Sequence, residues 1–419
     1  MPSALAEPSA PVALAQPAPP APAASARTAP AFRVTPALER IHALDEFQPL
    51  ARKKLPRQLY SYIHNGADDE QSLRGNRAAF NDYGFVARML EGVSARTQKT
   101  EIFGRTYESP FGISPVGLAA MWCYRGDLVL AQAAQAMGIP AVMSGASLVP
   151  MEVVAQGAPD TWFQAYIPGD AARVEALLQR IAQAGFKTLV VTVDLPVQVN
   201  QERYLKNGFT TPLRPSLRLA WDGISHPRWL LGTFAKTLAR HGMPHFENWR
   251  AERGAPILAA KVERDFQARD HLDWQHLGVV RELWKGPLVV KGIMRWQDAV
   301  RAQNLGVDGI VVSNHGGRQI DGAISPLRVL PEIVAAAPGL TVMMDSGIRR
   351  GSDVLKALSL GARCVFNGRS FNYAAAVAGH DGVCHAVSIL RAEIHRNMAL
   401  LGINRLDELD ASFVRGPAR

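Results

Sequence analysis

A short loop in the second half of the chain places a base beside a permanent cation. Residues 309–321 read Gly-Ile-Val-Val-Ser-Asn-His-Gly-Gly-Arg-Gln-Ile-Asp, so His315 and Arg318 flank two glycines. Histidine exchanges a proton near neutral pH, and the planar guanidinium of arginine matches a carboxylate. The glycines let a ligand approach the main chain closely. The loop follows a β-branched run, and this placement favours a functional site over a stray surface loop.

Glycines and arginines recur in two later loops, Asp-Ser-Gly-Ile-Arg-Arg-Gly at 345–351 and Asn-Gly-Arg at 367–369. Backbone N–H groups together with an arginine form a typical phosphate site, so these loops predict a phosphorylated cofactor. Lys291 ends an earlier apolar run. It could form a Schiff base, as in a lyase, or supply positive charge beside a cofactor that becomes anionic when reduced.

Eight short apolar runs alternate with helical patterns and position these residues. Alternating strands and helices imply parallel pairing, and eight units predict a closed (β/α)₈ barrel, the TIM barrel. The helical patterns include 127–137, 170–184, 296–305, 326–337 and 351–360. The strands are expected at about 111–115, 139–143, 161–166, 188–194, 287–291, 309–313, 341–345 and 363–367.

Polar residues end nearly every predicted strand. In such a barrel the chemistry gathers at the carboxyl ends of the strands, and loops seven and eight commonly bind phosphate. An open doubly wound sheet is the rival fold, but the chain contains no Gly-x-Gly turn for a dinucleotide and no Gly-Lys-Ser/Thr. The rim residues are Ser144, Gln164, Tyr166, Thr192, Asp194, Lys291, Ser313, His315, Arg318, Asp345, Gly347, Arg349, Gly368 and Arg369.

The segments outside the barrel differ in composition. Residues 1–36 contain nine prolines and twelve alanines and are predicted to be a disordered tail rather than a secretory signal. Residues 37–410 form the predicted barrel domain, in which 37–110 supply a helical cap with 44–62 as its clearest helix. Three scattered cysteines fit no disulfide framework and no Cys-based zinc site, so we expect a reducing, cytoplasmic setting.

A long loop insertion, 203–265, is predicted after the fourth strand. Its part from 203 to 250 carries eight Lys/Arg against two Asp/Glu, with Trp221, Trp229 and Trp249 among leucines. Basic residues interleaved with Trp and Leu suit an anionic membrane surface, which would make the protein peripheral on the cytoplasmic face of the inner membrane. The alternative is a loop that packs on the barrel. No nucleic-acid motif accompanies the charge.

With these motifs placed, the chain resembles the FMN-dependent 2-hydroxy-acid dehydrogenases and oxidases, a family that includes glycolate oxidase, lactate dehydrogenase and mandelate dehydrogenase. The resemblance covers roughly 38–409 and rests on Ser-Asn-His-Gly-Gly-Arg-Gln and Asp-Ser-Gly-Ile-Arg-Arg-Gly. It implies oxidation of an L-2-hydroxy acid to the 2-oxo acid, with FMN as cofactor. It also implies a homo-oligomer, often a tetramer.

The resemblance assigns roles by position. His315 would be the base, Asp194 its hydrogen-bond partner and Arg318 the carboxylate ligand, while Tyr62 and Tyr166 would contact the substrate. The flavin ring would be surrounded by Pro115, Val116, Gly117, Ser144, Gln164, Thr192, Lys291 and Ser313. The ribityl chain and phosphate would bind Asp345, Gly347, Arg349, Gly368 and Arg369.

Three positions indicate what kind of family member this chain is. One of them departs from the family pattern. Gln201 stands in the substrate region where a second arginine is usual, and Arg203 is the nearest cation that could replace it. Ala146 stands where oxidases often carry a bulky aromatic side chain, which predicts a bulky or aromatic substrate. Gly117 is commoner in members that pass electrons to a quinone or cytochrome, so we expect such an acceptor rather than oxygen.

Other interpretations remain open from sequence alone. They are an oxygen-using 2-hydroxy-acid oxidase, an enzyme for a larger or amine-bearing substrate, a lyase that uses Lys291, and a non-catalytic flavoprotein at a membrane. A metal site is not expected, because Pro244 interrupts the one helical histidine pair, His241 and His245.

Overall fold

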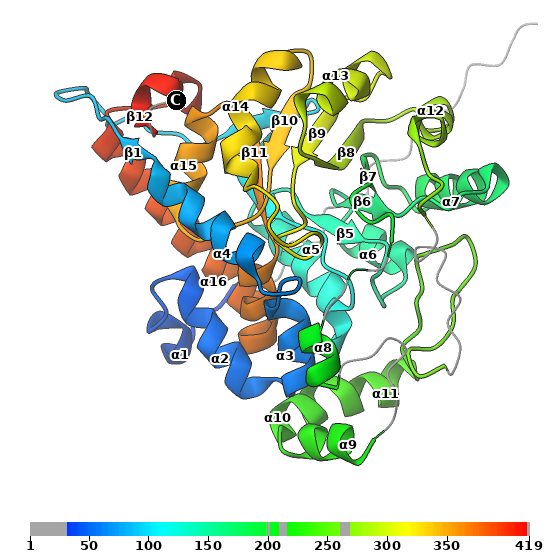
Figure 1. The fold of residues 1–419 in the computed structure, drawn as a ribbon. Coiled ribbons are helices and arrows are strands. Elements are labelled where there is room, and N and C mark those ends of the chain that lie inside the picture. Colours follow the sequence, from blue (N-terminus) through cyan, green and yellow to red (C-terminus); the bar gives the residue numbers. More distant parts are fainter. Residues whose placement is uncertain (1–31, 198, 200–201, 209–215, 260–268, 417–419) are drawn as a thin grey trace, which may run out of the picture. The chain divides into compact units, whose positions relative to one another are not determined.

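A parallel barrel forms the centre of the computed structural model, which describes residues 32–197, 199, 202–208, 216–259 and 269–416 (Figure 1). Eight parallel strands lie in the order β4-β11-β10-β9-β8-β7-β6-β5. A parallel bridge between Ile113 and Ala141 joins the two ends of this order, so the sheet closes. The strands are β4 (Phe111–Ile113), β5 (Val142–Ser144), β6 (Trp162–Ala165), β7 (Leu189–Thr192), β8 (Leu288–Ile293), β9 (Gly309–Val312), β10 (Thr341–Met344) and β11 (Cys364–Asn367).

The predicted (β/α)₈ barrel is therefore confirmed, and all eight predicted strands are present. The largest shift is at β5, which begins at Val142 although the prediction began at residue 139. Pro140 explains the difference, because proline has no N–H to donate to a ladder. Its carbonyl still accepts a hydrogen bond from the Ile113 amide at 2.9 Å.

Alternate strand residues fill the barrel interior. A hairpin of β2 (Thr100–Ile102) and β3 (Arg105–Tyr107) packs its apolar side chains into this interior beside the first residue of β6, Trp162. The Trp162 indole donates to the Tyr107 hydroxyl at 3.1 Å. The interior cluster comprises Ile102, Tyr107, Val142, Trp162, Val190, Val289, Val311, Met343, Cys364 and Phe366. This packing leaves the carboxyl ends of the strands as the place for a site.

Helices follow the strands as the sequence patterns predicted, and the ends of the five predicted helices shift by at most one residue. Their order and placement around the sheet are visible in Figure 1. The helix after β11 is interrupted by non-helical residues at Ala378 and Gly379. The helices are α5 (Gly126–Ala136), α6 (Met151–Gly157), α7 (Ala171–Gln183), α12 (Trp274–Leu283), α13 (Trp296–Asn304), α14 (Pro326–Ala336), α15 (Gly351–Ser359) and α16 (Arg369–Leu401).

The N-terminal cap is helical, but the single helix predicted over 44–62 is wrong. Pro56 divides it into α2 (Phe47–Lys54) and α3 (Arg57–His64), because a proline within a helix removes a hydrogen bond and clashes with the preceding turn. Two further helices, the short α1 (Pro36–Glu39) and α4 (Gln71–Ala78), flank this pair. Most of the predicted tail, residues 1–31, lies outside the described residues.

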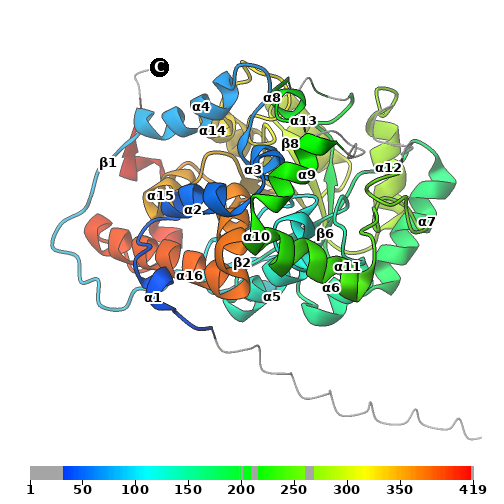
Figure 2. The ribbon, with the colours of Figure 1, turned by 90° about the horizontal axis from the view of Figure 1, so that it is seen from below.

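The insertion lies between β7 and β8 as predicted, but its described part is helical rather than loop alone. It contains α8 (Glu202–Lys206), α9 (Leu217–Ile224), α10 (Pro227–Trp229), the π-helical turn η4 (Leu230–Ala235) and α11 (Lys236–His241). The Ser216 hydroxyl caps α9 by accepting a hydrogen bond from the Leu219 amide at 3.1 Å. Figure 2 shows α9, α10 and α11 on the same side of the barrel as α1 and α2.

The insertion helices are amphipathic. Trp229 is buried and its indole donates to the Met121 carbonyl at 2.7 Å, which ties the insertion to the barrel. Large apolar side chains on the other face are exposed, namely Leu217, Trp221, Ile224 and Leu231. Within the described parts of the chain, no helix combines the length and apolar character needed to cross a bilayer.

Candidate active site

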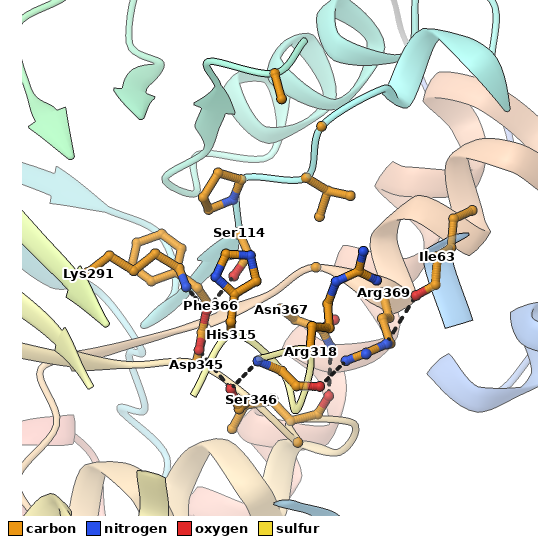
Figure 3. Close-up of a pocket in the computed structure, with 18 of the residues that line it drawn as sticks. Ile63, Ser114, Lys291, His315, Arg318, Asp345, Ser346, Phe366, Asn367 and Arg369 are labelled. Atoms are coloured by element: carbon orange, nitrogen blue, oxygen red, sulfur yellow. Dashed lines mark hydrogen bonds and ion pairs between the residues drawn. The ribbon is translucent and has the colours of Figure 1, made fainter. Parts of the chain in front are cut away.

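A pocket opens where the barrel strands end, and it gathers the predicted residues from six strand ends and the cap (Figure 3). Figure 3 shows His315 and Lys291 on one side of the pocket and Arg318 and Arg369 on the other. The predicted residues that line it are Tyr62, Pro115, Val116, Gly117, Tyr166, Lys291, His315, Arg318, Asp345, Gly347, Arg349, Gly368 and Arg369. Sequence positions more than 300 residues apart thus share one pocket.

His315 is held by two contacts. Its Nδ1 lies 2.9 Å from Oδ1 of Asp194, and its amide donates to the Ser313 hydroxyl at 3.0 Å. Its φ of 56° lies in the left-handed region, a strained conformation that functional sites often hold. An Nδ1 that donates to a carboxylate leaves Nε2 as the acceptor. His315 can therefore take up a proton from a ligand in the pocket.

Gly292 makes room for the Asp194 carboxylate. A Cβ at Gly292 would lie 2.7 Å from the Asp194 Cβ, and the glycine φ of 109° also excludes most side chains. The second carboxylate oxygen, Oδ2, is buried without a hydrogen-bond partner among the described residues. The Asp194 carboxylate therefore lies where its negative charge can stabilise a protonated His315 imidazole.

Arg318 is placed by the cap. Its Nη1 donates to the Tyr62 carbonyl at 2.6 Å, and its guanidinium lies 5.0 Å from the centre of the Tyr62 ring. Tyr166 also lines the pocket. Burial raises the pKa of Tyr166 to about 12, although Arg269 and Arg318 act in the other direction. The phenol therefore remains a hydrogen-bond donor across the physiological range.

Lys291 sits in a buried charged cluster. Its Nζ lies 2.9 Å from Asp345 Oδ2 and donates to the Ser313 hydroxyl at 2.8 Å. Burial alone would raise the pKa of Asp345, but Lys291 and hydrogen bonds from Ser313, Lys291 and Ser346 hold it below its ordinary value. An ammonium paired in this way is a poor nucleophile, which weighs against the Schiff-base interpretation.

Polar side chains at the ends of β5, β6 and β7 lie beside this cluster. We call these three residues, Ser144, Gln164 and Thr192, the polar shelf. The Ser144 hydroxyl donates to Gln164 Oε1 at 3.1 Å. Gln164 Nε2 and Thr192 Oγ1 are buried and have no hydrogen-bond partner among the described residues. Buried polar atoms are nearly always satisfied, so these two point to a polar ligand such as the edge of a flavin ring. The residues present therefore fit FMN.

The predicted phosphate end carries two partly buried arginines. Arg349 pairs with Asp45 at 3.1 Å and donates to the Ile348 carbonyl, while Arg369 donates to the carbonyls of Ile63, His64, Asn65 and Gly316. Burial lowers the pKa of both guanidiniums, that of Arg369 to about 10. The carbonyl partners of Arg369 leave its positive charge in place, so an anion still gains from binding there.

Glycines leave the main chain open around these arginines. A Cβ at Gly347, where φ is 89°, would lie 2.3 Å from the Asn76 carbonyl, and one at Gly368 would lie 3.0 Å from Val116 Cγ2. Both positions therefore need glycine for packing, and both lie on the pocket wall.

Five predicted residues do not line the pocket, namely Ser144, Gln164, Thr192, Asp194 and Ser313. Ser313 and Asp194 contact the lining residues Lys291 and His315, and the Ser144 hydroxyl accepts from the amide of the lining residue Ala146. Thr192 lines a second pocket.

Gln201 and Arg203 were expected near the substrate, but neither is among the described residues that line the pocket. Gln201 lies outside the described residues, and Arg203 is half-exposed and lies 3.5 Å from Glu70, away from the pocket. Sequence reasoning missed Ser346, whose hydroxyl joins Asp345 to the Gly316 amide, and Tyr204, which lies beside Arg318. Ser346 was inside a recognised motif, but nothing in the sequence marked Tyr204.

Comparison with known proteins identifies the family of this chain. The family model for FMN-dependent dehydrogenases matches residues 51–416. The chain belongs to the FMN-dependent dehydrogenase family. It is therefore a flavoprotein oxidoreductase with FMN as its cofactor, as its relatives are.

Two characterised relatives cover most of the chain. The (S)-mandelate dehydrogenase of Pseudomonas putida is 37% identical over 381 residues, which is 90% of this chain and 94% of that protein. The L-lactate dehydrogenase of Yersinia pestis (strain Pestoides F) is 39% identical over 377 residues, 88% of this chain and 97% of that protein. Both names are those of 2-hydroxy-acid dehydrogenases.

Solved structures give the same fold. The crystal structure of the monotopic membrane protein (S)-mandelate dehydrogenase superposes with a TM-score of 0.83 at 36% identity. It covers 90% of this chain and all of the compared one. A mandelate oxidase structure superposes with a TM-score of 0.74 at 32% identity and covers 90% of this chain and 98% of the compared one. This FMN-dependent dehydrogenase thus has the barrel of mandelate-oxidising relatives.

Proposed function

We propose that this dehydrogenase oxidises an L-2-hydroxy acid to the 2-oxo acid, with His315 as the base. The observation that carries the proposal is the His315–Asp194 contact at 2.9 Å in a pocket that also holds Arg318. FMN, when bound, accepts the two electrons released by the substrate. The remaining steps belong to side chains of the protein.

Arg318 binds the substrate carboxylate and Tyr166 donates a hydrogen bond to the substrate. Tyr62 closes the pocket from the cap. His315 Nε2 takes a proton from the substrate, and the Asp194 carboxylate stabilises the imidazolium that results. The same arrangement serves two routes, in which His315 removes either the hydroxyl proton or the Cα proton. In both, the imidazole must begin neutral and end charged.

The cofactor positions follow from the polar shelf and the two arginine loops. Ser144, Gln164, Thr192 and the Pro115–Gly117 main chain would hold the flavin ring, with Lys291 and Ser313 beside its pyrimidine edge. Asp345 and Gly347 would hold the ribityl chain, while Arg349, Gly368 and Arg369 would hold the phosphate. The buried unpartnered atoms of Gln164 and Thr192 support the ring position.

The side chain of the substrate is proposed to be bulky or aromatic. Ala146 lines the pocket and removes bulk from its wall. Tyr62 lines it too, and the ring of Trp122 lies 5.9 Å behind Tyr62. Such a surface favours an aryl group over the hydrogen of glycolate. The test is anaerobic bleaching of the bound flavin by mandelate, lactate and glycolate, where the fastest reduction is expected with mandelate and preferential reduction by glycolate would refute the pocket argument.

We also propose that the enzyme docks on an anionic membrane and passes electrons to a quinone. Exposed Leu217, Trp221, Ile224 and Leu231 lie on one helical segment with Arg228, Lys236 and Arg240. Apolar side chains among cations suit the headgroup region of a bilayer. Rapid reoxidation by quinone analogues and slow reoxidation by oxygen are expected in stopped-flow experiments.

Vesicle binding tests the docking surface directly. Leu217→Glu/Trp221→Glu should abolish sedimentation with vesicles that contain phosphatidylglycerol, while Leu400→Glu, at an exposed leucine on α16, should not. Equal vesicle binding by wild type, the double variant and Leu400→Glu would contradict the proposal. A homo-oligomer, proposed to be a tetramer, would elute at about four times the chain mass of 45.5 kDa.

A further inference from the structure

Tyr204 lies against the cation that is proposed to bind substrate, although it belongs to the insertion. It is buried, with 4% of its surface exposed. Its ring lies 5.9 Å from that of Tyr62, and the Arg318 guanidinium lies 5.7 Å from the centre of the Tyr204 ring. The same guanidinium lies 5.0 Å from Tyr62. We call the two rings around Arg318 the Arg318 cage.

The helix that carries Tyr204 is anchored to the cap. The Tyr204 hydroxyl donates to the Tyr62 carbonyl at 3.1 Å, and Asn207 Nδ2 donates to the Ser61 hydroxyl at 2.8 Å. The Tyr62 carbonyl also accepts from Arg318, so one oxygen joins both Tyr204 and Arg318 to α3. This carbonyl lies in the last turn of α3, where carbonyls lack helical partners.

The cage stabilises the charge of Arg318 without cancelling it. The centres of the Tyr62 and Tyr204 rings lie 5.0 Å and 5.7 Å from the guanidinium, which is the range of a cation–π contact. Among the described residues, no carboxylate forms a salt bridge with Arg318. A carboxylate partner would compete with the substrate, whereas a ring face attracts the cation and leaves its N–H donors free to bind.

We propose that Tyr204 is a positioning residue that holds Arg318 ready for the carboxylate of the substrate. The proposal rests on the proposed function, because it takes Arg318 as the carboxylate ligand. It assigns a specificity role to the insertion, since Tyr204 reaches the site from α8. Position 201, where the family usually carries a second arginine, is glutamine in this chain, so the placement of Arg318 matters more.

The test compares a charged substrate with an uncharged one in the full-length, FMN-loaded enzyme. Tyr204→Leu removes one ring of the cage, and KM for mandelate should rise about tenfold, the worth of a buried cation–π contact. KM for methyl mandelate, whose ester carries no charge, should stay within about twofold. Tyr204→Phe keeps the ring and should fall between wild type and Tyr204→Leu.

Two further variants separate the cage from simple docking of α8. Asn207→Ala removes an anchor of α8 without touching Arg318, so any effect should be equal for acid and ester. In the Arg318→Met background, Tyr204→Leu should no longer raise KM for mandelate, because the cation is gone. Flavin absorbance per chain checks that each variant still binds FMN.

Equal losses on mandelate and methyl mandelate in Tyr204→Leu, or no loss on either, would overturn the proposal. If Tyr204→Leu does not fold, Tyr204→Phe and Tyr204→Trp are compared in its place, and an acid-specific change must still appear. If wild-type enzyme oxidises no 2-hydroxy acid, the proposed function fails. Binding of benzoylformate, followed by the flavin spectrum, then tests the cage by itself.

Discussion

The Nδ1 atom of His315 lies 2.9 Å from Oδ1 of Asp194, although 121 positions separate the two residues. The contact joins the loop after β9 to the end of β7, and β8 lies between these strands. Gly292 of β8 leaves the space in which the carboxylate reaches the imidazole. The imidazole of this pair can accept a proton, and the carboxylate stabilises the imidazolium that results.

Replacing the base should stop the reaction without releasing the cofactor. His315→Gln keeps a polar side chain of similar size but cannot accept a proton, so kcat should fall by at least about 10³-fold. Flavin absorbance per chain should match wild type, because the polar shelf is intact. Turnover within tenfold of wild type would remove His315 from its role.

Asp194→Asn tests the partner of the base. The amide offers no negative charge to an imidazolium, so kcat should fall while KM for the substrate changes little. A loss of about 10²-fold is expected, smaller than that of His315→Gln because the proton acceptor remains. Single-turnover flavin reduction measures the step directly. An unchanged reduction rate would show that the contact only orients the ring.

The Lys291–Asp345 pair should support both stability and FMN binding. Lys291→Met leaves a buried carboxylate without its partner, which costs about 3–5 kcal/mol. Lys291→Met/Asp345→Asn should recover much of the melting temperature but not the FMN affinity, since the positive charge is still absent. Thermal melts and FMN titrations of the two variants separate these effects.

The pair also has a defined pH dependence. The pKa of Asp345 is held below its ordinary value of 3.8, so its contribution is present above that value and is lost as pH falls through the lower one. In Lys291→Met burial raises the pKa of Asp345, so the stability difference between wild type and the variant should already shrink as pH falls from neutrality and should shrink further below about pH 4. A difference that grows on acidification would contradict the assignment.

Enlarging position 146 should change substrate choice. Ala146 lines the pocket next to Gly117, where a Cβ on the glycine would already lie 2.7 Å from the Ala146 Cβ. Ala146→Phe should raise KM for mandelate by at least about tenfold while lactate stays within about threefold, because only the aryl group needs this space. Parallel losses on both substrates would place Ala146 outside the specificity pocket.

Asp127 should make the fold more stable in mild acid. Burial raises the pKa of this carboxyl to about 6, against hydrogen bonds from Ser147, Leu148 and Val149. The folded state then binds the proton more tightly than the unfolded state, so stability falls as pH rises towards 6. Relative to Asp127→Asn, wild type should gain about 1 kcal/mol between pH 7 and pH 5 in urea unfolding. An unchanged difference would show that the carboxyl stays ionised.

Much of the fold and most of the candidate site could be predicted from the sequence. Continuous apolar runs mark strands that are buried on both faces, and polar residues at their ends mark the rim of a barrel. These signals are local, so eight strands and the loops around His315 and Asp345 are found without coordinates. The sequence prediction missed the break between the two helices in 44–62, because it gave the helical pattern of this stretch more weight than the single proline, Pro56.

Only the tertiary structure decided which side chains meet. Closure of the barrel brings Asp194 to His315 and Lys291 to Asp345, and no spacing along the chain encodes those distances. The docking of α8 on α3 decides that Tyr204 lies beside Arg318 while Arg203 turns away to Glu70. The sequence by itself determined the residue types and their strand ends, since periodicity and turn residues are local properties. The pairing of charges and rings depends on packing between distant segments, which exists only in the folded chain.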